Sequence, residues 1–123
     1  MGWLQDETGL DRCAANHVPL TPLSLLARAA DVFRDRTALV DGLARYSYGE
    51  LHARVSRLAS ALAQSGIRPG DVVATLLPNV AAHVEAHFGV PAAGAVLNAI
   101  NTRLDSDTVA YILPNGIEAA VTL

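Results

Sequence analysis

Residues 72–100 read VVATLLPNVAAHVEAHFGVPAAGAVLNAI, and this stretch decides the fold. Val72–Leu77 is a short, almost wholly apolar run, which is typical of a strand covered on both faces. Asn79 can cap a helix that follows at once and must end or kink near Pro91, because proline has no backbone N–H to donate. Ala95–Ile100 reads as another buried strand. The pattern predicts two strands joined by a helix.

The same rhythm continues downstream. Asp105 or Ser106 can cap a short helix that runs to about Leu113. Pro114-Asn115-Gly116 breaks this helix, and Glu118–Leu123 begins a further strand. Strands that alternate with helices at this spacing predict a βαβαβ unit with a parallel sheet, and hence an α/β fold.

Upstream of this unit the sequence predicts a helix after an irregular start. Residues 1–20 show no periodicity and are expected to be a flexible lead-in. A helix begins at Thr21-Pro22, because threonine is a good N-cap and proline suits the first helical position. Apolar residues then recur at helical spacing, namely Leu25, Leu26, Ala29, Ala30 and Phe33.

A hairpin and a second helix follow. Asp41-Gly42 lies between two short apolar runs and signals a tight turn, since glycine tolerates positive φ. We expect strands at Thr37–Val40 and Ala44–Tyr48. Ser47 and Glu50 have the spacing of a capping box, which predicts the start of a helix. This helix carries an apolar face and is expected to close at Gly66, and that face is formed by Leu51, Val55, Leu58, Ala59 and Leu62.

The composition of the chain argues against several classes of function. The chain has 123 residues, enough for one domain with a core, and its net charge of −3 suggests neither a nucleic-acid surface nor a polybasic membrane anchor. No apolar run approaches the ~20 residues that span a bilayer, and the N-terminus lacks the pattern of a signal peptide. Cys13 is the only cysteine, which excludes an internal disulfide and fits a reducing compartment. We therefore expect a cytoplasmic soluble protein.

Two histidines in the opening stretch raise the question of zinc. His83 and His87 are four residues apart and would face the same way on a helix. Glu85 lies two residues after His83, whereas the H-E-x-x-H pattern needs its acid directly after the first histidine. No third ligand completes the set. We expect two partly buried or surface histidines on a docked helix, and no metal site.

The sequence also lacks a phosphate loop and a nucleophile. Gly89 and Gly94 sit at a helix end, where they permit close packing and an exit into the next strand, and neither glycine-rich phosphate pattern is present. There is no G-x-S-x-G elbow, and Cys13 has only His17 near it in sequence. We expect no catalytic, cofactor-binding or metal-binding residue in this chain.

The order of these local signals resembles the beginning of the adenylate-forming acid–CoA ligases, the AMP-binding acyl-activating enzymes. The likeness covers roughly residues 18 to 123. YSYGEL at 46–51 is similar to the family's first core motif, which opens its first long helix. HFGVPAAGAVLNAINTRL at 87–104 is similar to the second, a helix that ends in an alanine–glycine turn and a strand that leads to an Asn-x-Arg-Leu-like segment. Within the family, the sequence most resembles the medium-chain fatty acyl-CoA synthetases and the plant-type acyl-activating enzymes.

The resemblance implies a two-step reaction. A carboxylic acid, here expected to be a fatty acid, attacks ATP to give an acyl-adenylate and pyrophosphate. The thiol of coenzyme A then displaces AMP, with magnesium neutralising charge on the phosphates. In the family, the lysine-bearing loop rich in glycine and Ser/Thr, the acids that hold magnesium and ribose, and the C-terminal lysine domain all come after position 123. The resemblance thus implies that residues 21–123 are the N-terminal part of an AMP-binding domain, truncated before the ATP-binding loop. Its implied partners are the remainder of its own polypeptide and a carboxylic acid.

Two other interpretations stay open. The chain could be a non-catalytic truncated paralogue that acts as an interaction module, or a small nucleotide-binding α/β domain, which the missing phosphate loop disfavours. The nine basic residues are all arginine, so neither family lysine can lie in this chain. We expect the chain alone to be inactive, to bind ATP, magnesium and coenzyme A at most weakly, and to self-associate through exposed strand edges.

Overall fold

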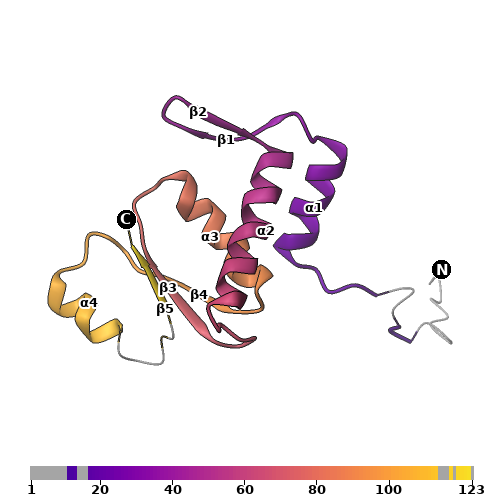
Figure 1. Ribbon diagram of the computed structural model, residues 1–123. Coiled ribbons are helices and arrows are strands. Elements are labelled where there is room, and N and C mark those ends of the chain that lie inside the picture. Colours follow the sequence, from indigo (N-terminus) through magenta and orange to yellow (C-terminus); the bar gives the residue numbers. More distant parts are fainter. Residues whose placement is uncertain (1–10, 14–16, 114–116, 118, 123) are drawn as a thin grey trace, which may run out of the picture.

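The computed structural model describes residues 11–13, 17–113, 117 and 119–122. In Figure 1 the first helix and a hairpin lie on one side of the molecule and a three-stranded sheet on the other, with two packed helices between them. The predicted α/β fold is confirmed, including the N-terminal helix, the hairpin and the βαβαβ unit. The expected lead-in at 1–20 lies largely outside the described residues.

The N-terminal helix and the hairpin form where the sequence predicts them. α1 spans Pro22–Val32, and the side chain of Thr21 accepts a hydrogen bond from the Ser24 N–H. β1, Thr37–Asp41, pairs antiparallel with β2, Ala44–Ser47. The turn between them places Gly42 at φ 56°, a conformation that costs glycine little because it has no Cβ.

α2 spans Tyr48–Gln64 and is capped at both ends by nearby residues. Both halves of the predicted capping box are present: Glu50 accepts from the Ser47 N–H at 2.8 Å, and Ser47 accepts from the Glu50 N–H at 3.2 Å. At the other end the N–H of Gly66 donates to Ala63 and that of Ile67 to Leu62, the pattern of a Schellman motif. Gly66 therefore closes the helix as predicted.

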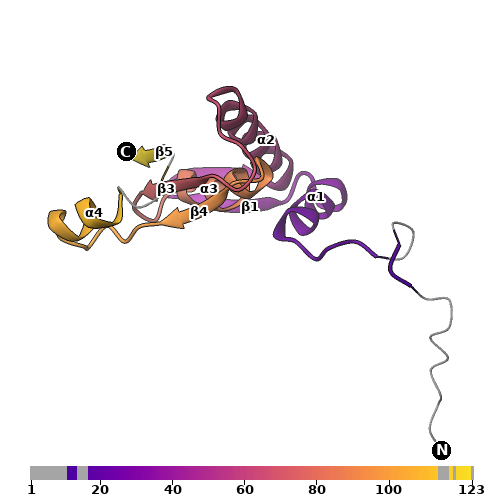
Figure 2. The same ribbon diagram turned by 90° about the horizontal axis from the view of Figure 1, so that it is seen from below.

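The βαβαβ unit builds a parallel sheet of order β4-β3-β5. β3 (Val72–Leu76) lies in the centre, and α3 (Ala81–Ala92) connects it to β4 (Val96–Ala99). α4 (Ser106–Ile112), capped by Asp105, then leads to β5 (Ala119–Thr122). Figure 2 shows α4 at the end of the sheet farthest from α1, and none of its described residues is buried.

The core has two parts on either side of α2 and α3. One cluster joins α2 and α3 to the sheet and contains Leu62, Val73, Val90 and Ala95. The other joins α1, α2 and the hairpin and contains Leu26, Leu51 and Val55, with Phe88 of α3 packed against it. α2 and α3 are therefore the shared wall on which both the hairpin and the sheet are built.

The structure corrects two details of the sequence interpretation. Asn79 does not cap α3: the N-cap position is Val80, and no side chain of the neighbouring residues supplies the capping bond. β4 is only partly buried, because it forms an edge of the described sheet and leaves the Val96 side chain 54% exposed. β3 fits the expectation better, since Val73, Ala74 and Thr75 are all buried.

Candidate functional site

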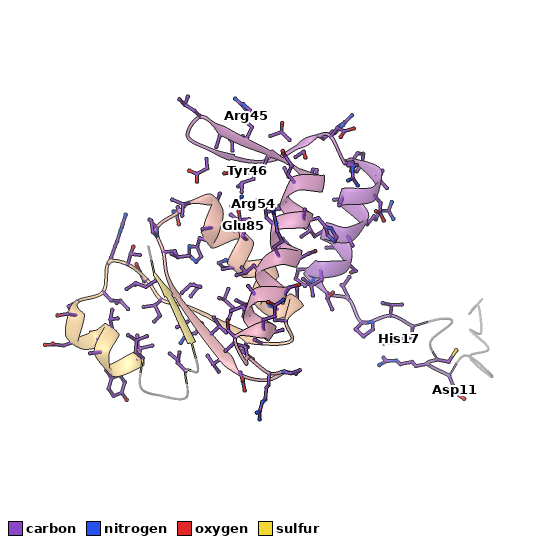
Figure 3. The ribbon with its side chains drawn as sticks, viewed as in Figure 1. Asp11, His17, Arg45, Tyr46, Arg54 and Glu85 are labelled. Carbon is purple, nitrogen blue, oxygen red and sulfur yellow. The ribbon has the colours of Figure 1, made fainter. Side chains whose placement is uncertain are left out.

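Among the described residues, one arginine of α2 contacts both the hairpin and α3. Arg54 of α2 donates a hydrogen bond from Nε to Oε1 of Glu85 on α3, over 2.5 Å. The guanidinium carbon of Arg54 also lies 5.0 Å from the ring centroid of Tyr46 on β2, within cation–π range. Figure 3 shows the three side chains together between the hairpin and the two helices. A single arginine therefore contacts all three elements.

The two partners of this ion pair differ in how far they are buried. The side chain of Glu85 is 11% exposed, whereas the side chain of Arg54 is 39% exposed. The hydrogen bond to Glu85 raises the pKa of Arg54 above its ordinary value, although partial burial works in the opposite direction. Because the charge of Arg54 is paired with a buried carboxylate, this arginine is engaged in holding the fold and is poorly suited to capture an anionic ligand.

The hairpin also supplies the cap that α3 lacks in its own sequence. Oδ2 of Asp41 accepts a hydrogen bond from the N–H of Ala81, the first residue of α3, over 2.8 Å. A groove of about 430 Å³ runs along this junction and is lined by residues of β1 and of the first turns of α3. His83 and His87 are among its lining residues.

The groove does not assemble a metal site from the described residues. The rings of His83 and His87 lie 4.8 Å apart, so the structure does bring them together. Nδ1 of His87 is 2.8 Å from the backbone oxygen of His83, a hydrogen bond within the helix that occupies this nitrogen. The described part of the chain contains no group of three His, Cys, Asp or Glu side chains placed to hold a metal ion. The absence of zinc stays a prediction.

The two glycines of the opening stretch lie near the end of α3: Gly89 is in its C-terminal half, and Gly94 follows its C-cap residue, Ala93. A Cβ at Gly89 would be 2.6 Å from Cδ2 of Leu58, so this glycine lets α2 and α3 approach closely. Gly94 has φ 80° and its N–H donates to the carbonyl of Pro91, which ends the helix. Neither is placed at the start of a helix, where a phosphate loop would be.

Three further arginines lie on different elements. Arg57 lies beside Arg54 at a shallow hollow on α2 and donates through Nε to its own helix, at the Ala53 carbonyl. Arg68 lies in the turn before β3, where its N–H donates to Asp71. Arg103 follows β4, and its N–H donates to Oδ1 of Asn101 at 2.9 Å. In the tail, the N–H of His17 donates to the carbonyl of Cys13.

Sequence reasoning missed the roles of Asp41 and of the Arg54–Glu85 pair. A signal for the pair was present: Glu85 is an acid inside a helix that is otherwise largely apolar, and such a helix is usually buried on most sides. A buried carboxylate needs a partner. Its identity could not be inferred, because Arg54 lies 31 residues earlier in the chain.

The chain was compared with known proteins. Residues 26–122 match the family model described as AMP-binding enzyme. The chain is 50% identical over 104 residues to the peroxisomal trans-cinnamate:CoA ligase of Petunia hybrida. The aligned residues are 85% of this chain and 18% of that protein. It is 44% identical over 117 residues to the peroxisomal acetate/butyrate–CoA ligase of Arabidopsis thaliana, covering 95% of this chain and 21% of that protein. The chain thus spans between 18% and 21% of the length of these two relatives.

Solved structures agree with this likeness. A protein of Rhodopseudomonas palustris described as a long-chain-fatty-acid CoA ligase superposes with a TM-score of 0.79 and 35% identity, over 84% of this chain and 26% of that one. The O-succinylbenzoate coenzyme A synthetase of Bacillus subtilis, solved with ATP and a magnesium ion, gives a TM-score of 0.74 and 30% identity, over 79% of this chain and 27% of that one.

The comparisons overturn one expectation from the sequence. The names of the two plant relatives place those proteins in the peroxisome, which contradicts the expectation of a cytoplasmic protein. The physical reason for the error is that a single cysteine and a mild net charge do not distinguish one reducing compartment from another. Separately, none of the helices in the described part of the chain has the length and apolar character that a membrane crossing requires.

Proposed function

This chain belongs to the AMP-binding enzyme family, and we propose that it is the N-terminal portion of an ATP-dependent acid–CoA ligase that forms an acyl-adenylate and then an acyl-CoA. The observation that carries the proposal is the 50% identity over 104 residues to a ligase that acts on trans-cinnamate. Relatives of similar identity are named for butyrate and benzoate, so the shared chemistry is activation of a carboxylic acid.

Within this enzyme the chain acts as scaffold. A carboxylate is a poor electrophile. Adenylation joins one of its oxygens to the α-phosphate of ATP with release of pyrophosphate, so that this oxygen can later depart as part of a good leaving group, AMP. That chemistry needs cationic groups around the triphosphate. The described residues do not fit this role, because Arg54 is paired with Glu85 and no group of three candidate metal ligands occurs among them. We therefore assign the binding of ATP, magnesium and coenzyme A to the rest of the polypeptide.

The contribution of these residues is to hold elements in place. α2 and α3 form a wall that carries the hairpin on one side and the parallel sheet on the other. In open α/β sheets, ligands bind outside the carboxyl ends of the strands. The loops that follow β3 and β4 lie at that edge, so the packing of α3 sets where this edge of the enzyme sits. Residues 21–123 are in this proposal the first part of the AMP-binding domain, ahead of its ATP-binding loop.

Product analysis on the complete polypeptide tests the proposal. The protein encoded by the whole reading frame is incubated with ATP, magnesium, coenzyme A and, in separate reactions, acetate, butyrate, a medium-chain fatty acid, benzoate or trans-cinnamate. Mass spectrometry should find the acyl-CoA of at least one acid, together with AMP. Reactions without coenzyme A should yield the acyl-adenylate and pyrophosphate but no thioester. AMP that forms equally with and without acid, with no thioester in any reaction, would contradict the proposal.

The interaction-module alternative makes a different prediction. A non-catalytic paralogue would have a reading frame without a lysine-bearing phosphate loop, and it would bind a full-length ligase. None of the comparisons favours this alternative. Self-association of residues 1–123 stays a prediction, supported by β4 and β5, each of which pairs on one side only within the described sheet. Sedimentation of residues 1–123 at increasing concentration tests it.

A further inference from the structure

A small cavity between β3, α2 and α3 contains two polar side chains with nearly complete burial. It has a volume of about 120 Å³, and its walls are otherwise aliphatic, with Leu58 and Leu62 from α2 and Val90 from α3 among them. The polar members are Thr75 of β3, which is 0% exposed, and Glu85 of α3, which is 8% exposed.

The hydroxyl of Thr75 has no hydrogen-bond partner among the described residues. Side chains alternate along a strand, so Thr75 points to the same face of β3 as Val73, the face that packs on α2 and α3. A buried hydroxyl without a partner loses its hydrogen bonds to water and gains nothing in return, and such groups are rare in folded proteins. The position of Thr75 therefore calls for a partner inside the cavity.

The carboxylate of Glu85 has acceptor sites left for a further hydrogen bond. An ionised carboxylate offers about four acceptor sites, and of the described residues only Arg54 donates to this one, at Oε1. A buried charge is stable only when further hydrogen bonds supplement its ion pair. Glu85 and Thr75 line the same cavity.

We propose that this cavity binds at least one internal water molecule that bridges the Thr75 hydroxyl and the Glu85 carboxylate. Water is the chemical match because it donates two hydrogen bonds and accepts two, and the volume exceeds the ~15 Å³ that one water needs. The water donates to Glu85 and exchanges a hydrogen bond with Thr75 Oγ1. It thereby fixes the carboxylate that Arg54 holds from the other side, and ties β3 to α3 through a polar link inside an apolar wall.

Crystal structures of the full-length protein and of matched variants test the inference. Thr75→Val keeps the shape of the side chain and removes the hydroxyl, while Thr75→Ser keeps the hydroxyl. We expect an ordered water within hydrogen-bond distance of both side chains in the parent protein and in Thr75→Ser, and its loss in Thr75→Val.

Crystals of the parent protein under xenon pressure give a second readout that does not depend on any variant folding. A wet polar cavity should exclude xenon, whereas a dry apolar cavity takes it up. Xenon in the cavity of the parent protein, or density that leaves Thr75 Oγ1 without a bridging water, would overturn the proposal. A water that persists unchanged in Thr75→Val would also overturn it, since the hydroxyl would then play no part.

Discussion

Asp41, at the end of β1, caps α3 by accepting a hydrogen bond from the N–H of Ala81 over 2.8 Å. The two residues lie 40 positions apart, so the start of this helix is fixed by a separate structural element and not by its own preceding residues. A carboxylate at this position also lies at the positive end of the helix dipole. The hairpin therefore contributes to the stability of the βαβ unit as well as to its own.

Replacing Asp41 by alanine should destabilise the protein by about 1 kcal/mol, because the first turn of α3 loses the side-chain cap that Asp41 provides. Asp41→Asn keeps an acceptor oxygen and should cost less. Asn79→Ala is the matched control, since Asn79 precedes α3 in sequence without capping it. The free energy of unfolding is measured with urea. Equal losses for Asp41→Ala and Asn79→Ala would contradict the assignment of the cap.

The Arg54–Glu85 pair should respond asymmetrically to the loss of either partner. Arg54→Met leaves the Glu85 side chain, which is 11% exposed, without its ion pair, whereas Glu85→Leu leaves an arginine that still reaches solvent. We expect Arg54→Met to cost roughly 1–3 kcal/mol, between the values for exposed and buried pairs, and Glu85→Leu to cost less. The double variant should recover much of the loss. A larger cost for Glu85→Leu, or additive effects in a double-mutant cycle, would count against this description.

Close approach of α2 and α3 at Gly89 can be tested in the same way. Gly89→Ala places a Cβ 2.6 Å from Cδ2 and 2.9 Å from Cγ of Leu58. Overpacking of this kind costs about 1–3 kcal/mol, which should outweigh the gain of up to about 1 kcal/mol from a better helix former. In a Leu58→Ala background the same change should become neutral or stabilising. Thermal unfolding of the four proteins decides the matter, and an unchanged effect in both backgrounds would show that the two residues do not meet.

Acid should weaken the start of α2. The pKa of Glu50 lies below its ordinary value because its carboxylate accepts from the backbone N–H and the side chain of Ser47. A depressed carboxylate pKa stabilises the fold above the unfolded-state pKa of about 4.3, and that contribution is lost as pH falls through the lower folded-state value. Glu50→Gln should remove this pH dependence. The pKa is read from a carbon-13 NMR titration, and a value at or above the ordinary one would refute the capping role.

The sequence interpretation succeeded where structure depends on neighbours in the chain. The Ser47–Glu50 capping box, the Gly42 turn and the Asp105 cap are each decided within four residues, so residue type and spacing suffice to predict them. The parallel strands followed from the alternation of apolar runs with a helix. These signals predicted the fold class correctly.

Interactions between distant residues were beyond the same reasoning. The cap by Asp41 depends on where the hairpin docks, and the pairing of Arg54 with Glu85 depends on how α2 crosses α3. Asn79 has the chemistry of a cap, but chemistry alone does not choose between a near acceptor and a distant one. The expectation that no catalytic, cofactor-binding or metal-binding residue lies in this chain stays a prediction.

Acid-dependent exchange of radiolabelled pyrophosphate into ATP tests the central claim most directly, because it reports adenylate formation without coenzyme A. The complete polypeptide and residues 1–123 are assayed side by side with short, medium-chain and aromatic acids. We predict exchange by the complete polypeptide with at least one acid and none by residues 1–123, which contain no lysine to place at the phosphates. Acid-dependent exchange by residues 1–123 after stringent purification, or none by the complete polypeptide with any acid, would contradict the account.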